Sequence, residues 1–287
     1  MEPCLSKLAE RMRCGRHNPD SITMHPFFTS AKPAVFAHRG GAALAPENTL
    51  AAFDRGLALG ADGIELDVHL SRDGAVVVHH DATVDRTTNG RGAVSALTAD
   101  ELAHLDAGYR FQDAGGPGYP FRGLGLGVPQ LADVLSHFRD ARVIIELKGS
   151  SGALALATVD VVRRAAAVNR VCIGSSSLRG LQTVRAVEPA IATSAAREEV
   201  RWAVYRAWIG RPPSRRAKYS VFQVPEVAGV TRVVSRRFVD LARRAGRPVQ
   251  VWTVNRADDA RRLLGWGVQA LITDRPDIMV PLVHDVY

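Results

Sequence analysis

The stretch GIELDVHLSRDGAVVVHH, residues 63–80, decides the fold. Its two apolar runs, 63–68 and 75–80, are separated only by a short segment that contains Asp73-Gly74. Parallel neighbouring strands need a crossover of about a dozen residues or more, so these runs cannot be parallel neighbours. Asp-Gly between apolar runs is typical of a two-residue turn, and we therefore expect an antiparallel hairpin here.

Outside the hairpin, short apolar runs alternate with segments of helical periodicity, which is typical of a parallel sheet with helical crossovers. Strands are expected at 34–38, 142–148, 170–175, 190–194, 221–225, 249–254 and 270–273. Helices are expected at 47–59, 129–139, 153–168, 177–187, 196–208, 235–245 and 257–265. With the second run of the hairpin set aside, eight parallel strands remain. The sequence therefore predicts an α/β fold, a (β/α)₈ TIM barrel.

One barrel accounts for most of the 287 residues. We assign residues 31–287 to it and residues 1–30 to a weakly structured N-terminal extension. Residues 82–128 interrupt the alternation with glycine-rich sequence and one short expected helix at 98–106. A connection of this length usually forms a lid, a small subdomain or a binding loop. We therefore predict a small insertion on the C-terminal rim of the barrel, after the second barrel strand.

The composition of the chain indicates its cellular location. Apolar residues make up 46% of the chain, which permits a sizeable core. No run of about 18 uncharged apolar residues is present, and the first 30 residues lack a continuous apolar segment, so neither a transmembrane helix nor a signal peptide is expected. Cys4, Cys14 and Cys172 show no metal-ligand spacing and are expected to be unpaired thiols in a reducing compartment. These features predict a cytoplasmic location.

The net charge of +8 is concentrated in one segment. Residues 197–247 hold thirteen Lys or Arg against four Asp or Glu, a net charge of +9, which leaves about −1 for the remainder. Arginines on solvated helices would explain this, and so would a face that attracts phosphate esters or an anionic membrane. Nucleic acid is not expected as a partner, because the segment lacks the interleaved aromatic platform of single-strand binders.

Acidic residues recur at the ends of two expected strands. Glu65 and Asp67 are two apart, so both point to one face, the interior of a barrel. Glu146 and Lys148 repeat this spacing on a later strand. Three carboxylates without cysteine favour a hard cation, Mg²⁺ or Ca²⁺. A structural network of salt bridges between these acids, Lys148 and Arg39 remains the alternative.

Two histidines are expected near the acids. His38 ends the first strand, where the catalytic groups of such barrels lie. A two-residue turn in the hairpin places His80 opposite Asp67, and a slightly shifted turn places it opposite Glu65, at about 4.5–5.5 Å. His79 then points the other way and is expected to be structural. Two histidines beside a cation could transfer the protons that a phosphoryl reaction needs.

Seven short motifs, taken in order, resemble those of the glycerophosphodiester phosphodiesterases. They are His38-Arg39-Gly40, Pro46-Glu47-Asn48-Thr49, Glu65-x-Asp67, His80-Asp81, Glu146-x-Lys148, VWTVN at 251–255 and LITDRP at 271–276. The resemblance implies a TIM barrel with an insertion after the His-Asp motif. It also implies metal-dependent hydrolysis of a glycerophosphodiester to glycerol 3-phosphate and an alcohol, through a cyclic phosphate formed by the substrate's own 2-hydroxyl.

The same resemblance implies a role for each matching residue. Metal binding falls to Glu65, Asp67 and Glu146, acid–base catalysis to His38 and His80, phosphate binding to Arg39 and Lys148, contact with the substrate to Trp252, and a supporting role to Glu47 and Asp81. Either histidine could be the initial base.

Two rival functions stay open. A lysophospholipase D would use the same chemistry on a lysoglycerophospholipid, with peripheral membrane contact through the basic segment 197–247. A non-catalytic module would bind metal or phosphate without turnover. Assays with water-soluble glycerophosphodiesters and lysolipids separate these functions.

Overall fold

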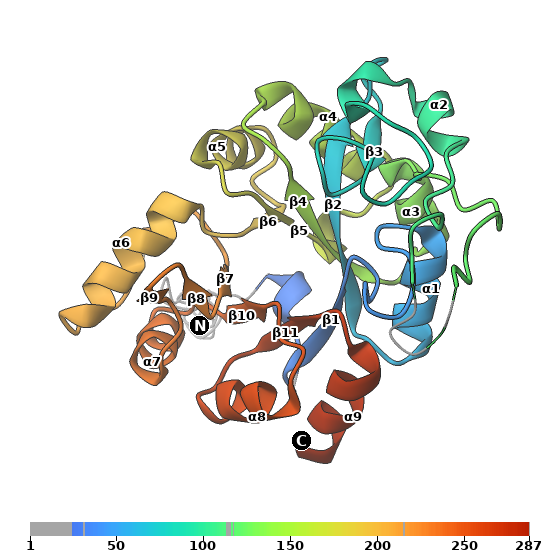
Figure 1. Ribbon diagram of the computed structural model, residues 1–287. Coiled ribbons are helices and arrows are strands. Elements are labelled where there is room, and N and C mark those ends of the chain that lie inside the picture. The colour runs from blue at the N-terminus through green and yellow to red at the C-terminus, as the bar shows by residue number, and fades with distance from the viewer. Residues whose placement is uncertain (1–24, 31, 113–115, 117, 215, 287) are drawn as a thin grey trace, which may run out of the picture.

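The computed structural model describes residues 25–30, 32–112, 116, 118–214 and 216–286. Eight parallel strands of this described part form a barrel surrounded by helices (Figure 1). These strands are β1 (Ala34–His38), β2 (Gly63–Leu70), β4 (Arg142–Leu147), β5 (Val171–Gly174), β6 (Ala192–Thr193), β7 (Phe222–Pro225), β10 (Val249–Trp252) and β11 (Ala270–Thr273). They follow the order β6-β5-β4-β2-β1-β11-β10-β7, which confirms the predicted topology.

Strands β6 and β7, the first and last in this order, meet and close the barrel. Ser194, directly after β6, forms a parallel bridge with Val221, directly before β7. Two backbone hydrogen bonds span the junction: the Ala195 N–H donates to the Val221 carbonyl over 2.9 Å, and the Ser220 N–H donates to the Thr193 carbonyl over 2.8 Å.

Helices cover the outside of the barrel. They are α1 (Leu50–Ala58), α3 (Leu131–His137), α4 (Gly152–Arg164), α5 (Leu178–Val187), α6 (Arg197–Trp208), α7 (Arg236–Arg244), α8 (Ala257–Gly265) and α9 (Pro276–Val286). Hydroxyl caps set several starts. The side chains of Thr49, Ser151 and Ser235 accept backbone N–H groups at the first turns of α1, α4 and α7, as caps of this type do. The sequence did not predict α9, which contains Pro281.

The barrel interior changes character along its axis. At the N-terminal end of the strands an apolar cluster fills it, composed of Ala34, Phe36, Ile144, Cys172, Ala192, Val221, Ala270 and Ile272 together with Phe27. Charged side chains occupy the C-terminal end. The outward faces of the strands pack against the helices in two larger apolar clusters. One end of the barrel is therefore an apolar core, and the other is available for chemistry.

A short segment before the barrel closes its apolar end. Residues Pro26–Phe28 form a 3₁₀ helix, and the buried ring of Phe27 stacks on Phe36 with centroids 5.7 Å apart. These residues lie before the expected barrel boundary at residue 31, and they pack on the apolar end of the barrel. The rest of the predicted extension, residues 1–24, lies outside the described residues, as do Cys4 and Cys14. Cys172 is a buried free thiol.

The hairpin that set the strand count is present, with a longer turn than predicted. Strand β3 (Val76–Val78) runs antiparallel to β2, with Val68 opposite Val78. Ser71 and Ala75 close a turn of three residues, 72–74, whose last residue Gly74 has φ +81°. Hairpins with three-residue loops commonly end on such a left-handed residue. The prediction of a two-residue turn was wrong, and the pairing shifts by one position.

The shift changes the expected partner of His80. The N–H of His79 donates to the carbonyl of Asp67 over 2.9 Å, so His79 takes the place predicted for its neighbour. His80 follows the end of β3, and it lies opposite neither Asp67 nor Glu65 in the ladder. The side chain of His79 is buried and lies near the Thr83 carbonyl, as expected of a structural residue.

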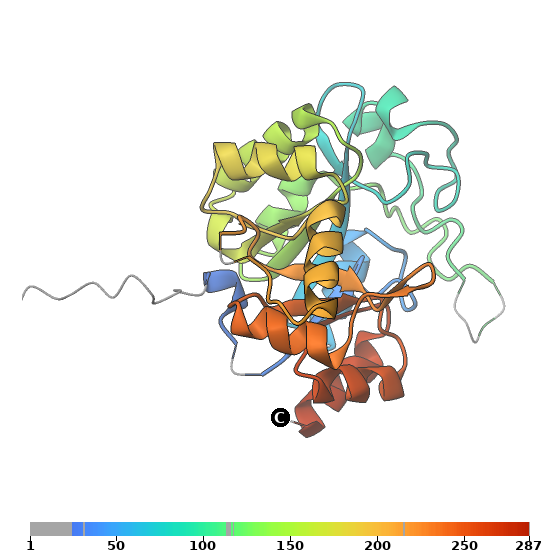
Figure 2. The same cartoon turned by 90° about the vertical axis from the view of Figure 1, so that its left-hand side faces the viewer.

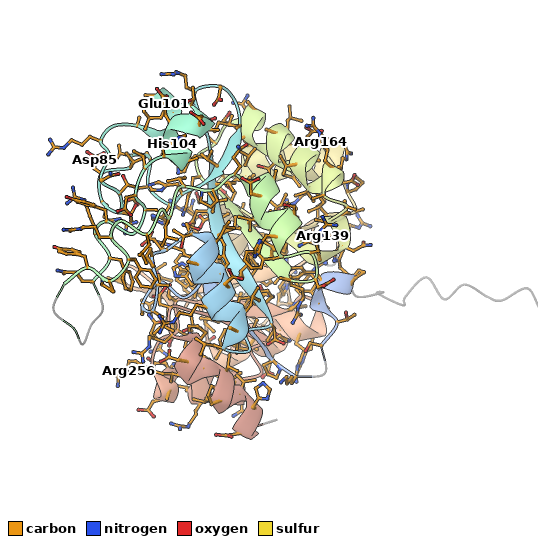
Figure 3. The ribbon with its side chains drawn as sticks, turned by 90° about the vertical axis from the view of Figure 1, so that its right-hand side faces the viewer. Asp85, Glu101, His104, Arg139, Arg164 and Arg256 are labelled. Carbon is orange, nitrogen blue, oxygen red and sulfur yellow. The ribbon has the colours of Figure 1, made fainter. Side chains whose placement is uncertain are left out.

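Residues 82–128 form the expected insertion on the C-terminal rim. They contain the 3₁₀ helix Val94–Ala96 and α2 (Ala99–Ala103), and they pack on β3 through a small apolar core of their own. In Figure 2 the insertion and the 3₁₀ helix at Pro26–Phe28 lie at opposite ends of the barrel. Figure 3 shows Asp85, Glu101 and His104 on the outer side of the insertion.

Two further features complete the fold. The short strands β8 (Val227–Ala228) and β9 (Thr231–Arg232) form a hairpin after β7 that the sequence did not predict. Among the described residues, no helix combines the length and hydrophobicity needed to cross a bilayer.

Candidate active site

Strand register gathers the predicted catalytic residues. His38 of β1 is the register partner of Glu65 on β2, and Asp67 of β2 is the partner of Glu146 on β4. Glu65 and Asp67, two residues apart, point to the same side of β2. These four side chains therefore meet inside the C-terminal end of the barrel, although they come from three strands.

The three carboxylates lie close enough to share one cation. A ligand oxygen from each of Glu65, Asp67 and Glu146 lies within 4.8 Å of the others. Two basic side chains contact this cluster: Lys148 Nζ lies 2.9 Å from Asp67 Oδ1 and 3.0 Å from Glu146 Oε2, and Arg39 Nε lies 3.3 Å from Asp67 Oδ2. The bases predicted to hold phosphate thus pair with the acids, as in the alternative of a salt-bridge network.

The two buried acids respond differently to their surroundings. Burial and the charge of Asp67 raise the pKa of Glu65. Burial also disfavours the charged form of Asp67, but Lys148 and Arg39 outweigh this and lower its pKa. The negative charge of Glu65 is therefore the poorly compensated one. A set of three carboxylates in which one negative charge lacks a basic partner fits a hard cation such as Mg²⁺ or Ca²⁺.

His38 is oriented by a carboxylate on its other side. Its Nδ1 lies 2.6 Å from Asp274 Oδ1, and its Nε2 lies 3.8 Å from Glu65 Oε2. Asn255 donates to Asp274 Oδ2 over 2.8 Å and holds that carboxylate in place. Burial lowers the pKa of His38, but Glu65 and Asp274 outweigh it and raise the pKa. A carboxylate at Nδ1 fixes the ring and leaves Nε2 facing the acidic cluster.

The loop after β1 is built to bring its backbone close. Arg39, Gly40 and Gly41 all adopt positive φ, at 51°, 89° and 99°. A Cβ on Gly40 would lie 2.6 Å from the backbone of Ala52 in α1, so only glycine fits. This tight turn lets the N–H of Arg39 donate to Glu65 Oε2 over 3.1 Å. The glycines that follow His38 thus shape the wall of the site.

Asn48 clamps Asp67, a role that the sequence analysis missed. Its amide Nδ2 donates to Asp67 Oδ2 over 2.9 Å, and its Oδ1 accepts the N–H of Asp67 over 3.3 Å. Asn48 is buried at φ 59°, a conformation that asparagine tolerates better than most residues. Its place in the Pro46-Glu47-Asn48-Thr49 motif was the available signal. Asp274 and Asn255 were likewise quoted within motifs without being given a role.

A chain of polar contacts, most of them ion pairs, runs from His80 to Arg39. His80 Nδ1 lies 2.6 Å from Asp81 Oδ1, and Arg86 Nε donates to Asp81 Oδ2 over 2.5 Å. Arg86 also binds both oxygens of Glu47 at 2.7 and 2.8 Å, and Arg39 donates to Glu47 over 3.0 Å. This geometry suits supporting roles for Glu47 and Asp81. Arg86, which joins them, was not anticipated from the sequence.

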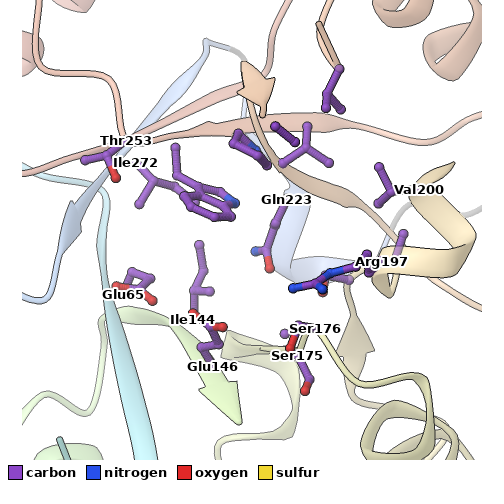
Figure 4. Close-up of a pocket in the computed structure, with 18 of the residues that line it drawn as sticks. Glu65, Ile144, Glu146, Ser175, Ser176, Arg197, Val200, Gln223, Thr253 and Ile272 are labelled. Carbon is purple, nitrogen blue, oxygen red and sulfur yellow. The ribbon is translucent and has the colours of Figure 1, made fainter. Parts of the chain in front are cut away.

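Most of the predicted residues open onto one cavity of about 1050 Å³. Its lining includes His38, Arg39, Glu65, His80, Glu146, Lys148 and Trp252. The remaining predicted residues, Asp67, Glu47 and Asp81, are not part of the lining, and they contact residues that are. Figure 4 shows Glu65 and Glu146 at one side of this cavity and Val200 and Arg197 at the other.

Several apolar side chains line the cavity beside α6, together with Arg197 and Arg201, and we call this part of the cavity the apolar arm. Val200, Val204 and Trp208 line it from that helix, and Val224 and Val233 line it from β7 and the segment after β9. The acidic cluster and the apolar arm therefore share one continuous space. Such a cavity can hold a polar phosphodiester at one end and leaves room for an apolar group at the other.

Comparisons with known proteins agree with this architecture. Residues 38–278 match the model of the glycerophosphoryl diester phosphodiesterase family. A glycerophosphodiester phosphodiesterase of Caldanaerobacter subterraneus subsp. tengcongensis is 32% identical over 266 residues, which cover 88% of this chain and 98% of that relative.

Two solved structures have the same fold at lower or similar identity. The crystal structure of a glycerophosphodiester phosphodiesterase from Agrobacterium tumefaciens has a TM-score of 0.70 at 30% identity, covering 87% of this chain and 99% of that one. An Oleispira antarctica phosphodiesterase, solved in complex with the product sn-glycerol-3-phosphate, has a TM-score of 0.69 at 25% identity, covering 88% and 97%.

Proposed function

The chain belongs to the glycerophosphoryl diester phosphodiesterase family, and we propose that it hydrolyses water-soluble glycerophosphodiesters with the help of one divalent cation. It is a glycerophosphodiester phosphodiesterase, the name given to relatives with 31% and 32% identity over most of the chain. The products would be glycerol 3-phosphate and an alcohol. The observation that carries the metal-dependent mechanism is the cluster of three carboxylates within 4.8 Å, next to a carboxylate-held histidine.

Charge at the site suits a phosphodiester. Glu65, Asp67 and Glu146 would hold Mg²⁺ or Ca²⁺, which when bound supplies positive charge for the phosphate oxygens. Lys148 and Arg39 lie beside these acids and would donate charge-assisted hydrogen bonds to the same phosphate. Trp252, on the cavity wall and 42% exposed, would contact the substrate.

The two histidines would move the protons. One would take the proton of the substrate's 2-hydroxyl as that oxygen attacks phosphorus, and the other would give a proton to the leaving alcohol oxygen. Water would then open the cyclic phosphate with the two roles exchanged. Asp274 and Asp81 each engage the Nδ1 of one histidine. The bound sn-glycerol-3-phosphate in the Oleispira structure supports this choice of product.

Release of glycerol 3-phosphate from glycerophosphocholine tests this proposal. Protein stripped with a chelator should be inactive and should recover with Mg²⁺ or Ca²⁺. His38→Ala should lower kcat by about 10²–10⁴-fold, the usual contribution of a general acid or base. His104→Ala, whose side chain is 77% exposed on the insertion, is the matched control and should have normal activity. Activity that survives chelation, or near-normal turnover by His38→Ala, would refute the mechanism.

The apolar arm of the cavity favours a second substrate class, the lysoglycerophospholipids. A volume of about 1050 Å³ lies at the upper end of the range of about 300–1,000 Å³ typical of small-molecule sites. The arm would then hold the acyl chain of a lysolipid while the phosphate occupied the acidic end. Comparing kcat/KM for glycerophosphocholine and lysophosphatidylcholine distinguishes the two classes. A higher value for the lysolipid would make the chain a lysophospholipase D.

A further inference from the structure

Exposed apolar side chains gather on one part of the molecule. Of the twelve large apolar side chains that are exposed among the described residues, six lie on or next to α6 and on the β8–β9 hairpin. We call them the α6 surface: Trp202, Tyr205, Trp208, Ile209, Val227 and Val230. Contiguous exposed apolar side chains usually mark a site of interaction.

The barrel does not need these side chains for packing. Ala203, Val204 and Ala207 already bury the inner face of α6. Trp202, Tyr205 and Ile209 recur at spacings of three and four residues, so they form one stripe, and Trp202 stacks on Tyr205 with ring centroids 5.6 Å apart. Helix α6 lies at the periphery of the molecule (Figures 1 and 2).

The α6 surface borders the catalytic cavity. Tyr205 and Trp208 belong both to this surface and to the cavity lining. Arg197, at the start of the same helix, lies at the edge of the cavity in Figure 4, and Ala228 and Thr231 of the hairpin also line it. A binding partner that contacts Trp208 would therefore lie next to the catalytic cavity that contains Glu65.

The segment of the chain that contains this surface is positively charged. The segment 197–247, which contains α6 and the hairpin, has a net charge of +9. Three of its four acids already pair with arginine: Glu199 with Arg185, Glu226 with Arg232 and Arg262, and Asp240 with Arg243. A positively charged protein surface that also exposes tryptophan, tyrosine and aliphatic side chains is suited to the headgroup region of an anionic bilayer.

We propose that the α6 surface docks on an anionic lipid membrane and holds the mouth of the catalytic cavity against it. On the premise of the second substrate class of the proposed function, this places the cavity where the lysoglycerophospholipids of a membrane are presented. Trp202 and Tyr205 would sit at headgroup level, as these residues do at membrane interfaces, with Ile209 and Val230 inserted beside them.

Nucleic acid is the rival occupant, and the structure removes one argument against it. The basic segment was expected to lack an aromatic platform, yet Trp202 and Tyr205 stack on each other there. Bases stack on aromatic rings, whereas Ile209, Val227 and Val230 offer them nothing comparable. Half of the α6 surface is aliphatic, which favours a lipid.

Vesicle sedimentation of the full chain tests the docking. The wild type should bind vesicles of phosphatidylcholine with phosphatidylglycerol at least about tenfold more tightly than vesicles of phosphatidylcholine alone, and added salt should weaken the binding. The double variant Trp202→Gln/Ile209→Gln should weaken binding to the anionic vesicles about tenfold or more. It should hydrolyse glycerophosphocholine normally, since neither residue lines the cavity. Leu156→Gln, at an equally exposed site on α4, is the control and should bind normally.

Several results would overturn the proposal: no binding of the wild type to anionic vesicles, equal binding to neutral ones, or unaltered binding by the double variant. Tight binding of single-stranded DNA that the double variant loses would assign the surface to nucleic acid. A dimer in sedimentation velocity that the double variant converts to a monomer would assign it to a second copy of the chain. A wild-type protein that binds the anionic vesicles but does not hydrolyse glycerophosphocholine would count against the proposed function alone.

Discussion

Asp67 shows how much of the site depends on residues that do not face the substrate. It is 1% exposed, and Asn48 and Arg39 contact it from the loop after β1 while Lys148 contacts it from the end of β4. A buried carboxylate with this many partners has one orientation, and that orientation decides where its oxygens meet a cation. Partners of metal ligands typically contribute about 10–100-fold to affinity or activity.

Asn48→Gly should therefore weaken cation binding about 10–100-fold. Glycine retains the positive φ of this position and removes only the side chain that holds Asp67. Calorimetric titration of the chelator-treated protein with Mg²⁺ or Ca²⁺ measures the affinity. Asn169→Gly, at an exposed position, should bind the cation normally. Equal affinities for the two variants would show that Asp67 does not need its amide partner.

At this scale the sequence predicted the acids and missed what orients them. Glu65 and Asp67 were predictable because a spacing of two residues fixes a common face. Asp274 contacts His38 across 236 positions of sequence, and no local pattern reports such a contact. Arg86 was hidden for a similar reason, because its partner Glu47 lies 39 positions away.

Among the elements, the turn that links β1 to α1 is constrained in both backbone conformation and packing. Gly40 combines φ +89° with a position against the backbone of Ala52, whereas Gly74 in the hairpin has φ +81° with open space around it. The two glycines thus share a backbone conformation and differ in crowding. Substituting each of them therefore measures how much the close packing of the loop against α1 adds to the cost of backbone strain.

Gly40→Ala should lower the free energy of unfolding by about 3 kcal/mol or more, the sum of backbone strain and overpacking. Gly74→Ala should lower it by only about 1 kcal/mol, since strain acts there alone. Urea denaturation of both variants gives the comparison. Similar losses for the two would mean that α1 moves aside without cost and that the turn is not constrained by packing.

A second link between elements is the carboxylate of Glu47, which joins the loop after β1 to Arg86 in the insertion. Burial opposes its charge, but Arg86 and Arg39 lower the pKa of Glu47 to about 2, from an ordinary value of 4.5. A lowered pKa in the folded state stabilises the protein above pH 4.5. This stabilisation is lost as the pH falls through 4.5 toward 2.

Glu47→Gln should consequently lower the free energy of unfolding at pH 7 by about 2 kcal/mol, after allowance for the half-exposed Arg86. The difference from the wild type should shrink as the pH approaches 2. Chemical denaturation between pH 3 and 7 follows it, with Asp100→Asn on the exposed part of the insertion as the control. A difference that does not depend on pH would show that the charge of Glu47 contributes nothing.

Elements were predicted well where short apolar runs alternate along the chain with segments of helical periodicity. The expected strands 34–38 and 270–273 match β1 and β11, and the expected helix 257–265 matches α8. The turn at 72–74 was misjudged because Asp-Gly also fits a three-residue loop. The two-residue strands β8 and β9 are too short to show a period, and Pro281 inside α9 conceals its helical pattern.

The whole molecule separates stability from chemistry along the barrel axis. The apolar cluster around Phe36 and the cover formed by Phe27 occupy one end, and the carboxylates occupy the other. The apolar cluster takes only one or two residues from each of most strands. Its composition could therefore not be predicted from the sequence without the order of the strands. The same separation means that damage at one end should leave the other intact.

Phe27→Ala should accordingly lower the free energy of unfolding by about 3–5 kcal/mol, the usual loss for a buried phenylalanine. Its kcat for glycerophosphocholine should remain normal at temperatures where it is folded. Thermal unfolding and the phosphodiesterase assay measure the two quantities. Phe28→Ala, at a half-buried position, should lose much less stability. A marked fall in kcat for folded Phe27→Ala would contradict the separation.

The junction between β6 and β7 gives the cylinder a seam. Strands β2 and β4 pair through six residues, whereas one bridge and two flanking hydrogen bonds join β6 to β7. Hydrogen exchange should find the amides of Ala195 and Ser220 opening well before that of Glu146, because weakly paired backbone opens locally at lower free energy. Equal protection of these three amides from exchange would show that the β6–β7 junction is as rigid as the rest of the barrel. This junction lies beside α6. Local opening of the barrel wall would therefore occur first next to the apolar arm, and it would widen the cavity there without unfolding the remaining strands.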